Sequence, residues 1–237
     1  MFKALLAVGF AIALTFASAA QTITGQYDCI PAGAYTLCQN LWGEYAGVGS
    51  QNSTLISTNG NAVTWQTNWT WANNPNTVKS CASHSFPIAS SAPTAWNWTY
   101  VTESQGIRAD VSYDIWFGKA QSGNPATSAS SYEIMIWLSG LGGIQPVGHQ
   151  ILSGLNIAGH TWNLWSGPNS NWQVFSFVIS SGEVRNFSAD LNEFFQYLIQ
   201  SQGVASTQYL QAIQVGTEPF VGSASLLTES FAVAVNV

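Results

Sequence analysis

The segment Tyr132-Glu133-Ile134-Met135-Ile136-Trp137-Leu138 constrains the fold of this chain more than any other. Its β-branched and aromatic residues favour a β-strand, in which successive side chains point to opposite faces. One predicted face is apolar and consists of Tyr132, Ile134, Ile136 and Leu138. The other face consists of Glu133, Met135 and Trp137. Because dry burial strongly disfavours a lone carboxylate, Glu133 belongs either in a groove that holds a sugar ring or at a solvent-exposed strand edge.

The first twenty residues have the pattern of a secretory signal peptide. Met1-Phe2-Lys3 gives a positive start, an apolar run follows as far as Phe16, and the small residues Ala17-Ser18-Ala19-Ala20 precede Gln21. We therefore expect residues 1–20 to be removed and residues 21–237 to be secreted to the extracellular space. Cleavage after Ser18 or Ala19 is also compatible with the sequence. A membrane anchor is the weaker alternative, because the apolar run is short for a bilayer span.

Composition restricts the partners of the mature chain. Charged residues make up 7% of the sequence and aromatic residues 13%, and there are 11 Trp at a formal net charge of −6. After removal of the leader, the remaining basic residues are Lys79, Arg108, Lys119 and Arg185. No basic patch is present, so we expect no nucleic-acid partner.

No later segment is apolar enough to cross a bilayer, so we expect no membrane partner after cleavage. Many Trp and few charges favour carbohydrate, because indole rings stack on the C–H faces of sugars.

Residues 21–237 are predicted to form a single all-β domain. The length is ordinary for one β-sandwich, and no linker, charge block or internal repeat divides it. Asn59-Gly60 and Ser166-Gly167-Pro168-Asn169 are typical of hairpin connections. Many short strands with such turns indicate a β-sandwich or jelly roll. The predicted strands are residues 35–37, 62–71, 77–84, 95–101, 107–117, 132–138, 147–155, 160–165, 172–179, 209–216 and 225–235.

One helix is predicted to begin after Ser188. Ser188 is a suitable N-cap residue, and Asp190 and Glu193 follow it where the helix dipole favours negative charge. Gly203 is placed to end the helix. The apolar residues that recur on one helical face are Leu191, Phe194, Phe195, Leu198 and Ile199. This apolar stripe indicates packing against the core rather than cofactor binding.

The cysteines and glycosylation motifs suit an exported protein. Cys29 and Cys38 flank a turn, so we predict a disulfide between them and an unpaired Cys81, although pairing through Cys81 remains open. Asn-X-Ser/Thr motifs, which carry N-glycans in a eukaryotic host, occur at Asn52, Asn68, Asn97 and Asn186.

Three of the 11 acidic residues have settings that suggest chemistry. Asp114 alternates with Trp116 along a predicted strand, which repeats the arrangement around Glu133. Glu218 precedes Pro219, which favours an extended backbone. Each acid alone is compatible with an ordinary exposed carboxylate. A pair of carboxylates on either side of a glycosidic bond, however, supplies what sugar hydrolysis needs, and a third acid such as Asp114 helps to set their different ionisation.

Several segments resemble the signature segments of glycoside hydrolase family 12. The two most specific are Ser131-Tyr132-Glu133-Ile134-Met135-Ile136-Trp137-Leu138 and Gly216-Thr217-Glu218-Pro219-Phe220-Val221-Gly222. Three shorter segments, Asn40-Leu41-Trp42-Gly43, Tyr113-Asp114-Ile115 and Trp172-Gln173-Val174-Phe175-Ser176-Phe177, also fit. The resemblance extends over essentially the whole mature chain.

The resemblance implies a β-jelly roll of two curved antiparallel sheets, with one α-helix and an open substrate cleft on the concave face. It implies endo-acting, retaining hydrolysis of β-1,4-glucan, with Glu133 as nucleophile, Glu218 as general acid/base and Asp114 as the acid that hydrogen-bonds the nucleophile. The implied substrate contacts are Asn40, Trp42, Met135, Trp137 and Pro146. Alternation along the strand adds Trp116 as a further contact.

One departure from the family pattern and several alternatives accompany this interpretation. Many family members bridge the first Cys to one that follows the Asn-Leu-Trp-Gly segment, whereas Cys38 precedes Trp42 here. Pro219-Phe220 favours glucanases over the related xylanases. We expect a monomer that cleaves cellulose-type and mixed-linkage β-glucans, with a xyloglucan-specific endoglucanase as the alternative substrate preference. A non-catalytic carbohydrate-binding sandwich and a cell-wall-loosening protein are alternatives of other classes. No metal or cofactor motif is evident, because His84, His149 and His160 form no ligand pattern.

Overall fold

The computed structural model describes residues 20–72, 80–84, 91–121 and 123–236, and for residues 80–84 it describes the backbone alone. The predicted signal peptide, apart from Ala20, lies outside the described residues, as does the start of the strand predicted over 77–84. Within the described part of the chain, no helix is both long and apolar enough to cross a bilayer.

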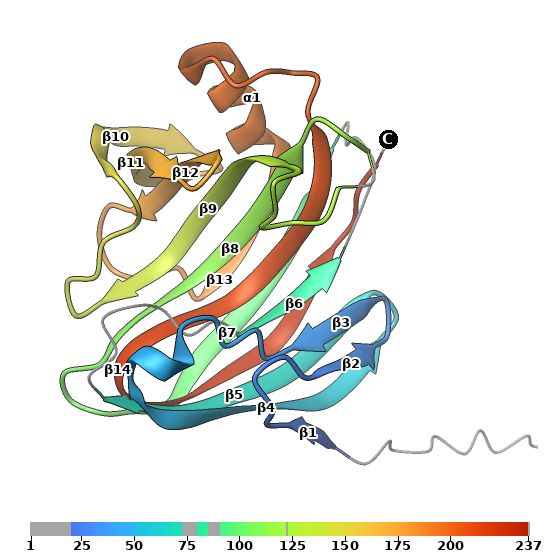
Figure 1. Ribbon diagram of the computed structural model, residues 1–237, viewed down its shortest axis with the longest axis vertical. Helices are drawn as coiled ribbons and strands as arrows, with labels where there is room; N and C mark the ends of the chain where they lie inside the picture. Colours follow the sequence, from blue (N-terminus) through green and yellow to red (C-terminus); the bar gives the residue numbers. More distant parts are fainter. Residues whose placement is uncertain (1–19, 73–79, 85–90, 122, 237) are drawn as a thin grey trace, which may run out of the picture.

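The strands form two sheets that share one long strand, β14 (Tyr209–Val233) (Figure 1). Sheet A contains, in spatial order, β1 (Gln21–Ile23), β4 (Val48–Asn59), β5 (Ala62–Ala72), the C-terminal half of β14, β7 (Pro93–Glu103) and β13 (Asn186–Asp190). Sheet B contains β2 (Cys29–Ala32), β3 (Tyr35–Cys38), β6 (Ser80–His84), the N-terminal half of β14, β8 (Arg108–Gly118), β9 (Ser130–Leu141), β12 (Trp172–Ile179), β11 (His160–Asn169) and β10 (His149–Ile157). The predicted all-β sandwich of the jelly-roll type is confirmed.

One strand pair differs from the expected antiparallel arrangement. β12 pairs with β9 in parallel, while the other strand pairs of the described sheets are antiparallel. The cause is the connection 142–148 between β9 and β10. It takes the chain past the positions that β12 and β11 occupy in the sheet, so that β10 lies three strand positions from β9. The hairpins β10–β11 and β11–β12 then bring the chain back toward β9. As a result, Val174 of β12 lies beside Glu133 of β9.

β14 was predicted as two separate strands, 209–216 and 225–235, and this prediction is wrong because the structure shows one strand. The residues that interrupted the pattern, Pro219 and Gly222, lie where β14 passes from sheet B to sheet A. The register shifts between Pro219 and Val221, and Gly222 has a positive φ of 105°. Proline and glycine thus mark a bend within the strand rather than its end.

Four strands were not predicted: β1, β2, β4 and β13. β4 lacked an apolar signal because its inward-facing residues are polar. Gln51 and Ser53 are buried, and both bond Gln39: the Gln39 Nε2 group donates to the Gln51 carbonyl oxygen (2.7 Å) and the Ser53 hydroxyl donates to Gln39 Oε1 (3.1 Å). A buried hydrogen-bond network here replaces the apolar stripe that sequence periodicity detects.

Turn predictions were partly correct. β4 ends at Asn59 and β5 begins at Ala62, which confirms the hairpin at Asn59-Gly60. The turn predicted over residues 166–169 is displaced, because β11 continues to Asn169 and the chain reverses at Ser170, whose φ is 54°.

The helix α1 (Asn192–Gln202) ends at Gly203 in the left-handed conformation, as predicted. Ser188 is not its N-cap, because Ser188 lies in β13 opposite Ala95. The N-cap is Leu191, and the side chain of the preceding residue helps to hold the start of the helix: Asp190 Oδ1 accepts hydrogen bonds from the backbone N–H groups of Asn192 (3.0 Å) and Ala92 (2.7 Å). Tertiary pairing with β7 therefore outweighed the local capping preference of Ser188.

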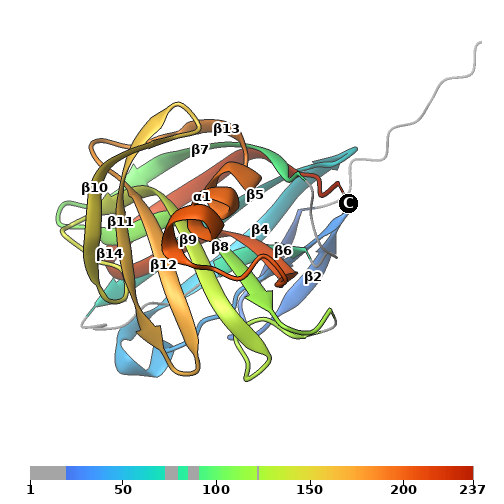
Figure 2. The ribbon, with the colours of Figure 1, turned by 90° about the horizontal axis from the view of Figure 1, so that it is seen from above.

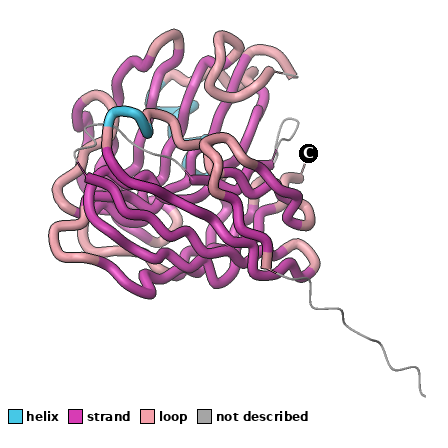
Figure 3. Tube along the Cα trace, turned by 60° about the horizontal axis from the view of Figure 1, so that its bottom comes forward, coloured by secondary structure: helices cyan, strands magenta, loops and turns pink. Residues whose placement is uncertain are grey.

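The main core lies between sheet A, the inner face of sheet B and α1. Figures 2 and 3 show the backbone of these strands and of the helix from two further directions. Ile134, Ile136 and Leu138 of β9 belong to this core, as alternation predicts. Phe194 and Phe195 of α1 are buried, and their rings contact other aromatic rings of the core, among them those of Phe177 and Phe117. The predicted helical stripe is therefore core packing. Burial raises the pKa of the Tyr113 hydroxyl, so this core residue stays neutral at ordinary pH.

The disulfide predicted between Cys29 and Cys38 is confirmed, and it links β2 to β3. The backbone of Cys81 lies directly opposite Cys38 in β6, but its side chain lies outside the described part of the structure.

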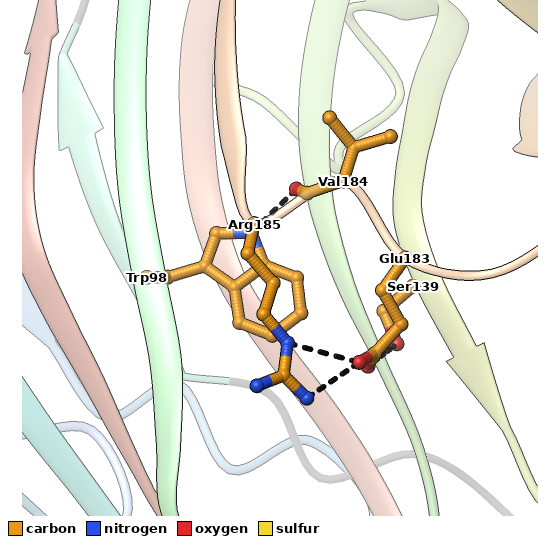
Figure 4. A network of polar contacts seen from close by, with 5 residues as sticks. All are labelled: Trp98, Ser139, Glu183, Val184 and Arg185. Carbon is orange, nitrogen blue, oxygen red and sulfur yellow. Dashed lines mark hydrogen bonds and ion pairs between the residues drawn. The ribbon is translucent and has the colours of Figure 1, made fainter.

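A polar network fixes the end of β9 to the neighbouring elements (Figure 4). The Ser139 hydroxyl donates to Glu183 (2.8 Å), and Arg185 donates to the same carboxylate through Nε (3.0 Å) and Nη2 (2.6 Å). The Arg185 guanidinium lies 5.7 Å from the centre of the Trp98 ring. Trp98 Nε1 in turn donates to the Val184 carbonyl oxygen at 3.0 Å. The network joins β7, β9 and the connection before β13, and so holds in place the strand that carries Glu133.

The four glycosylation motifs form two cross-strand pairs. Asn52 lies directly opposite Asn68, and Asn97 lies directly opposite Asn186. Asn68 Nδ2 also donates a hydrogen bond to Asn52 Oδ1 at 3.2 Å. Paired residues of an antiparallel ladder share a face, with Cβ atoms about 5 Å apart. Two bulky glycans on one pair would therefore compete for the same space.

We accordingly expect at most one N-glycan on each pair when the protein is secreted from a yeast host. Digestion with endoglycosidase H leaves a single N-acetylglucosamine on each occupied asparagine, so the intact mass counts the occupied sites. The expected mass corresponds to no more than two such sugars. A mass that corresponds to three or four would contradict the steric argument.

Candidate functional site

Glu133 lies on the outer face of sheet B, opposite the main core. In the strand register it faces Trp116 of β8 on one side and Val174 of β12 on the other. Its side chain is only 5% exposed. Met135 and Trp137 share this face and form a separate buried cluster with Val174, as alternation along the strand predicts.

Asp114 occupies the same face, one strand away. It lies opposite Met135 of β9 and opposite Gln214 of β14, and its side chain is 6% exposed. This register makes Asp114 a diagonal neighbour of Glu133. Such neighbours are close enough for side chains to interact.

A pocket of about 500 Å³ opens over these two acids. Five of the predicted site residues line it: Asn40, Trp42, Asp114, Trp116 and Glu133. The lining also includes six residues that were not predicted as site residues: Asn124, Pro125, Ala126, Asn169, Trp172 and Gln214. The pocket is thus formed mainly by indole rings, amides and carboxylates, a set of groups that suits a neutral, hydroxyl-rich ligand.

The segment Asn40-Leu41-Trp42-Gly43 brings Trp42 to the pocket through two left-handed residues. Asn40 has a φ of 50° and Gly43 a φ of 82°, conformations that Asn and Gly adopt at the least cost. Between them, Leu41 enters the core and Trp42 remains 56% exposed. The ring of Tyr27 packs against Trp42, with 5.0 Å between the ring centres. Sequence reasoning did not identify Tyr27.

Trp172, the first residue of β12, contacts Glu133 directly. Its indole Nε1–H donates a hydrogen bond to Glu133 Oε2 at 2.8 Å. The Trp172 ring also packs edge-to-face against Trp116, with 5.1 Å between ring centres. No local sequence pattern predicted this contact, because it depends on the parallel pairing of β12 with β9.

Glu218 lies on β14, is 7% exposed and faces Asp110 of β8. Asp110 Oδ1 accepts a hydrogen bond from the Glu218 backbone N–H (2.9 Å), and the Thr217 hydroxyl donates to the Asp110 carbonyl oxygen (2.6 Å). The fully buried Asp110 therefore fixes the backbone at Glu218. Sequence reasoning did not single out Asp110. Burial raises the pKa of the neighbouring Tyr100 hydroxyl, and the charges of Asp110 and Glu183 raise it further.

The register places Glu218 and Glu133 on the same face of sheet B. Alternate residues of β8 from Asp110 to Trp116 point to this face, with Glu218 opposite Asp110 and Glu133 opposite Trp116. The two glutamates therefore lie on the two strands next to β8, with Glu218 near one end of this stretch of β8 and Glu133 near the other. Within the described residues, Glu218 is not part of the lining of the pocket over Glu133.

The remaining predicted contacts lie outside the described lining of the pocket. Met135 and Trp137 are buried, and Pro146 is half-buried in the connection 142–148. Ile144 of that connection packs on the Met135–Trp137 cluster. None of the three predicted contacts is among the described residues that line the pocket. Across the described part of the chain, no group of three or more His, Cys, Asp or Glu side chains is arranged to hold a metal ion.

Known proteins share both the sequence and the fold. Residues 33–236 match glycosyl hydrolase family 12. The xyloglucan-specific endo-β-1,4-glucanase A of Emericella nidulans is 40% identical over 243 residues, which cover 95% of this chain and 98% of that protein. The protein of the same name from Aspergillus aculeatus is 41% identical over 215 residues, which cover 87% of each chain.

Two solved structures extend the comparison. Endoglucanase 3 of Trichoderma harzianum, from family GH12, superposes with a TM-score of 0.85 at 33% identity, covering 92% of this chain and 99% of that one. The catalytic domain of Humicola grisea Cel12A, in complex with a soaked thio cellotetraose, superposes with a TM-score of 0.81 at 34% identity, covering 91% and 99%. With a match over nearly all of the described residues and an acidic, indole-lined pocket on sheet B, the chain belongs to glycosyl hydrolase family 12.

Proposed function

We propose that this protein is a secreted endo-β-1,4-glucanase that hydrolyses cellulose-type and mixed-linkage β-glucans with retention of configuration. The observation that best supports the proposal is the position of Glu133. It lines a pocket together with Trp42, Trp116 and Trp172, and Asp114 is in the same lining. The aromatic rings would bind the faces of glucose units, and the carboxylate would attack a sugar held between them.

In the first step, the Glu133 carboxylate attacks the anomeric carbon while Glu218 donates its proton to the glycosidic oxygen. The bond between the anomeric carbon and that oxygen breaks, and a glycosyl ester of Glu133 forms. In the second step, the Glu218 carboxylate takes a proton from water, the water oxygen attacks the anomeric carbon, and Glu133 leaves. Two inversions give net retention and require the two carboxyl groups to be roughly 5–5.5 Å apart during the reaction.

The other site residues would hold these groups and the substrate. Asp114, as the diagonal neighbour of Glu133, would orient the nucleophile through a hydrogen bond. Asn40, Trp42 and Trp116 would contact the glucan within the pocket. Met135, Trp137 and Pro146 would border the reacting sugar. Secretion is supported by the leader pattern of residues 1–20, and the enzyme is proposed to act as a monomer without a cofactor.

Xyloglucan is the second candidate substrate. The relatives from Emericella nidulans and Aspergillus aculeatus are both named xyloglucan-specific, and each is about 40% identical to this chain. The backbone of xyloglucan is also β-1,4-glucan, so the same two carboxylates would cleave it. The preference depends on whether the pocket rim admits xylosyl branches.

Rates of reducing-sugar release from barley β-glucan, carboxymethyl cellulose, xyloglucan and xylan test the proposal. We expect release from the two unbranched glucans, a mixture of product lengths early in the reaction, and little release from xylan. Faster release from xyloglucan than from either unbranched glucan would favour the second substrate. Binding to glucan without any release of reducing sugar would refute hydrolysis and favour a carbohydrate-binding protein.

A further inference from the structure

We infer that Trp172 is a positioning residue for Glu133, whose indole N–H holds one carboxylate oxygen of the nucleophile in place during turnover. This inference deepens the proposed function and rests on the assignment of Glu133 as the nucleophile. The contact that supports it is the hydrogen bond of 2.8 Å from Trp172 Nε1 to Glu133 Oε2.

The hairpin before Trp172 is fixed to the strand that carries Glu133. The side-chain amide of Asn171 donates a hydrogen bond to the Ser130 carbonyl oxygen at 3.0 Å. Ser130 is the first residue of β9, and Gln173 then pairs with Tyr132 in the parallel register. The backbone of Trp172 is thereby held at a fixed position along β9, close to Glu133.

The orientation of the Trp172 ring is also restricted. Its ring meets Trp116 at an interplanar angle of 73°, with 5.1 Å between ring centres. Trp116 is buried and lies directly opposite Glu133 in the register. Rotation of the Trp172 side chain would break both the ring contact and the hydrogen bond. The N–H group is therefore directed at the carboxylate by packing as well as by its own bond.

The hydrogen bond should favour the free carboxylate over the glycosyl ester. A donor binds an ionised oxygen about twice as strongly as a neutral one. Glu133 has its full charge before attack and again after the ester is hydrolysed. Loss of the N–H should therefore slow the second step, in which Glu133 leaves as an anion. It should also move the acidic limb of the pH profile of kcat/KM, which reports the free enzyme, to higher pH, because the ionised form of Glu133 loses a donor.

Other titratable groups on this face are the same in every variant. Asp110 and Asp114 of β8 and Glu218 of β14 share this face of sheet B with Glu133, and β12 contributes no titratable side chain. A difference in the pH profile between wild type and a Trp172 variant therefore reports on the indole.

The decisive comparison uses Trp172→Phe with 2,4-dinitrophenyl β-cellobioside. Its leaving group needs no proton, so kcat reports hydrolysis of the glycosyl-enzyme. We expect kcat to fall about tenfold, the KM to stay the same or fall, and the acidic limb of the kcat/KM profile to move to higher pH. If Trp172 serves only to stack on a sugar, the KM will rise and the acidic limb will not move, which overturns the inference.

Trp69→Phe is the matched control. Trp69 is a core residue of β5, and its Nε1 has no hydrogen-bond partner among the described residues. This variant loses the same atoms and tests for a general effect of indole loss. We expect a lower melting temperature with unchanged kcat and an unchanged pH profile. An equal fall in kcat in both variants would overturn the specific role of Trp172.

A second replacement keeps the shape of the ring. Benzothienylalanine at position 172 has a sulfur atom in place of the indole N–H and preserves the contact with Trp116. We expect it to reproduce the kcat and pH effects of Trp172→Phe, and wild-type kinetics in this variant would overturn the inference. A wild-type enzyme that released no sugar from any β-1,4-glucan would instead refute the proposed function, so the two failures are distinguishable.

Discussion

Replacing Glu133 with Gln is expected to lower the kcat on barley β-glucan by a factor on the order of 10⁴ or more. Gln has almost the same shape, so the fold and the hydrogen bond with Trp172 Nε1 can persist. It is a very poor nucleophile, however, and cannot form the glycosyl ester. Initial rates of reducing-sugar release, with circular dichroism to verify folding, measure the effect.

Glu229→Gln is the control for this substitution. Glu229 is an exposed residue in the sheet A half of β14, remote from the pocket. It changes the net charge by the same amount, and we expect wild-type rates. Turnover by Glu133→Gln within a few-fold of wild type would exclude Glu133 as the nucleophile.

Replacing Glu218 with Ala should have a large effect that depends on the leaving group. We expect kcat/KM on polymeric β-glucan to fall by about 10³-fold or more, because the glycosidic oxygen no longer receives a proton. The first step with 2,4-dinitrophenyl β-cellobioside should be much less affected, since dinitrophenolate leaves unprotonated. Stopped-flow measurement of the dinitrophenolate burst separates the two steps.

Azide provides a positive test of the same variant. With Glu218 removed, water is no longer activated in the second step, but azide needs no general base and can enter the vacated space. We expect azide to accelerate turnover of the dinitrophenyl substrate and to give the β-glycosyl azide. Equal losses on both substrates without azide rescue would contradict the acid/base role.

The strand patterns with apolar alternation were the most predictable part of the fold. β9 was recognised because Ile134, Ile136 and Leu138 alternate with Glu133 and Met135, and both faces lie where the alternation places them. β4 was missed because its buried residues Gln51 and Ser53 are polar and are hydrogen-bonded to Gln39. Periodicity detects burial only where the buried side chains are apolar.

The site was predictable where its residues lie in local motifs and unpredictable where they depend on strand order. The Asn40–Trp42 segment and the alternation of Asp114 with Trp116 were visible in the sequence, and the structure brings these residues to one pocket with Glu133. Trp172 reaches Glu133 through a parallel pairing that no local pattern encodes. Asp110 acts on Glu218 from a strand 108 residues away in sequence.

The most direct test of the central claim is to trap the glycosyl-enzyme. A 2-deoxy-2-fluoro-β-cellobioside with a dinitrophenyl leaving group should inactivate the enzyme with one label per chain, because the fluorine slows both steps whereas the activated leaving group speeds only the first, so the glycosyl-enzyme accumulates. Peptide mass spectrometry should locate the label on Glu133, and Glu133→Gln should remain unlabelled. A label on a different carboxylate, or continued hydrolysis with inversion and no label, would contradict the account.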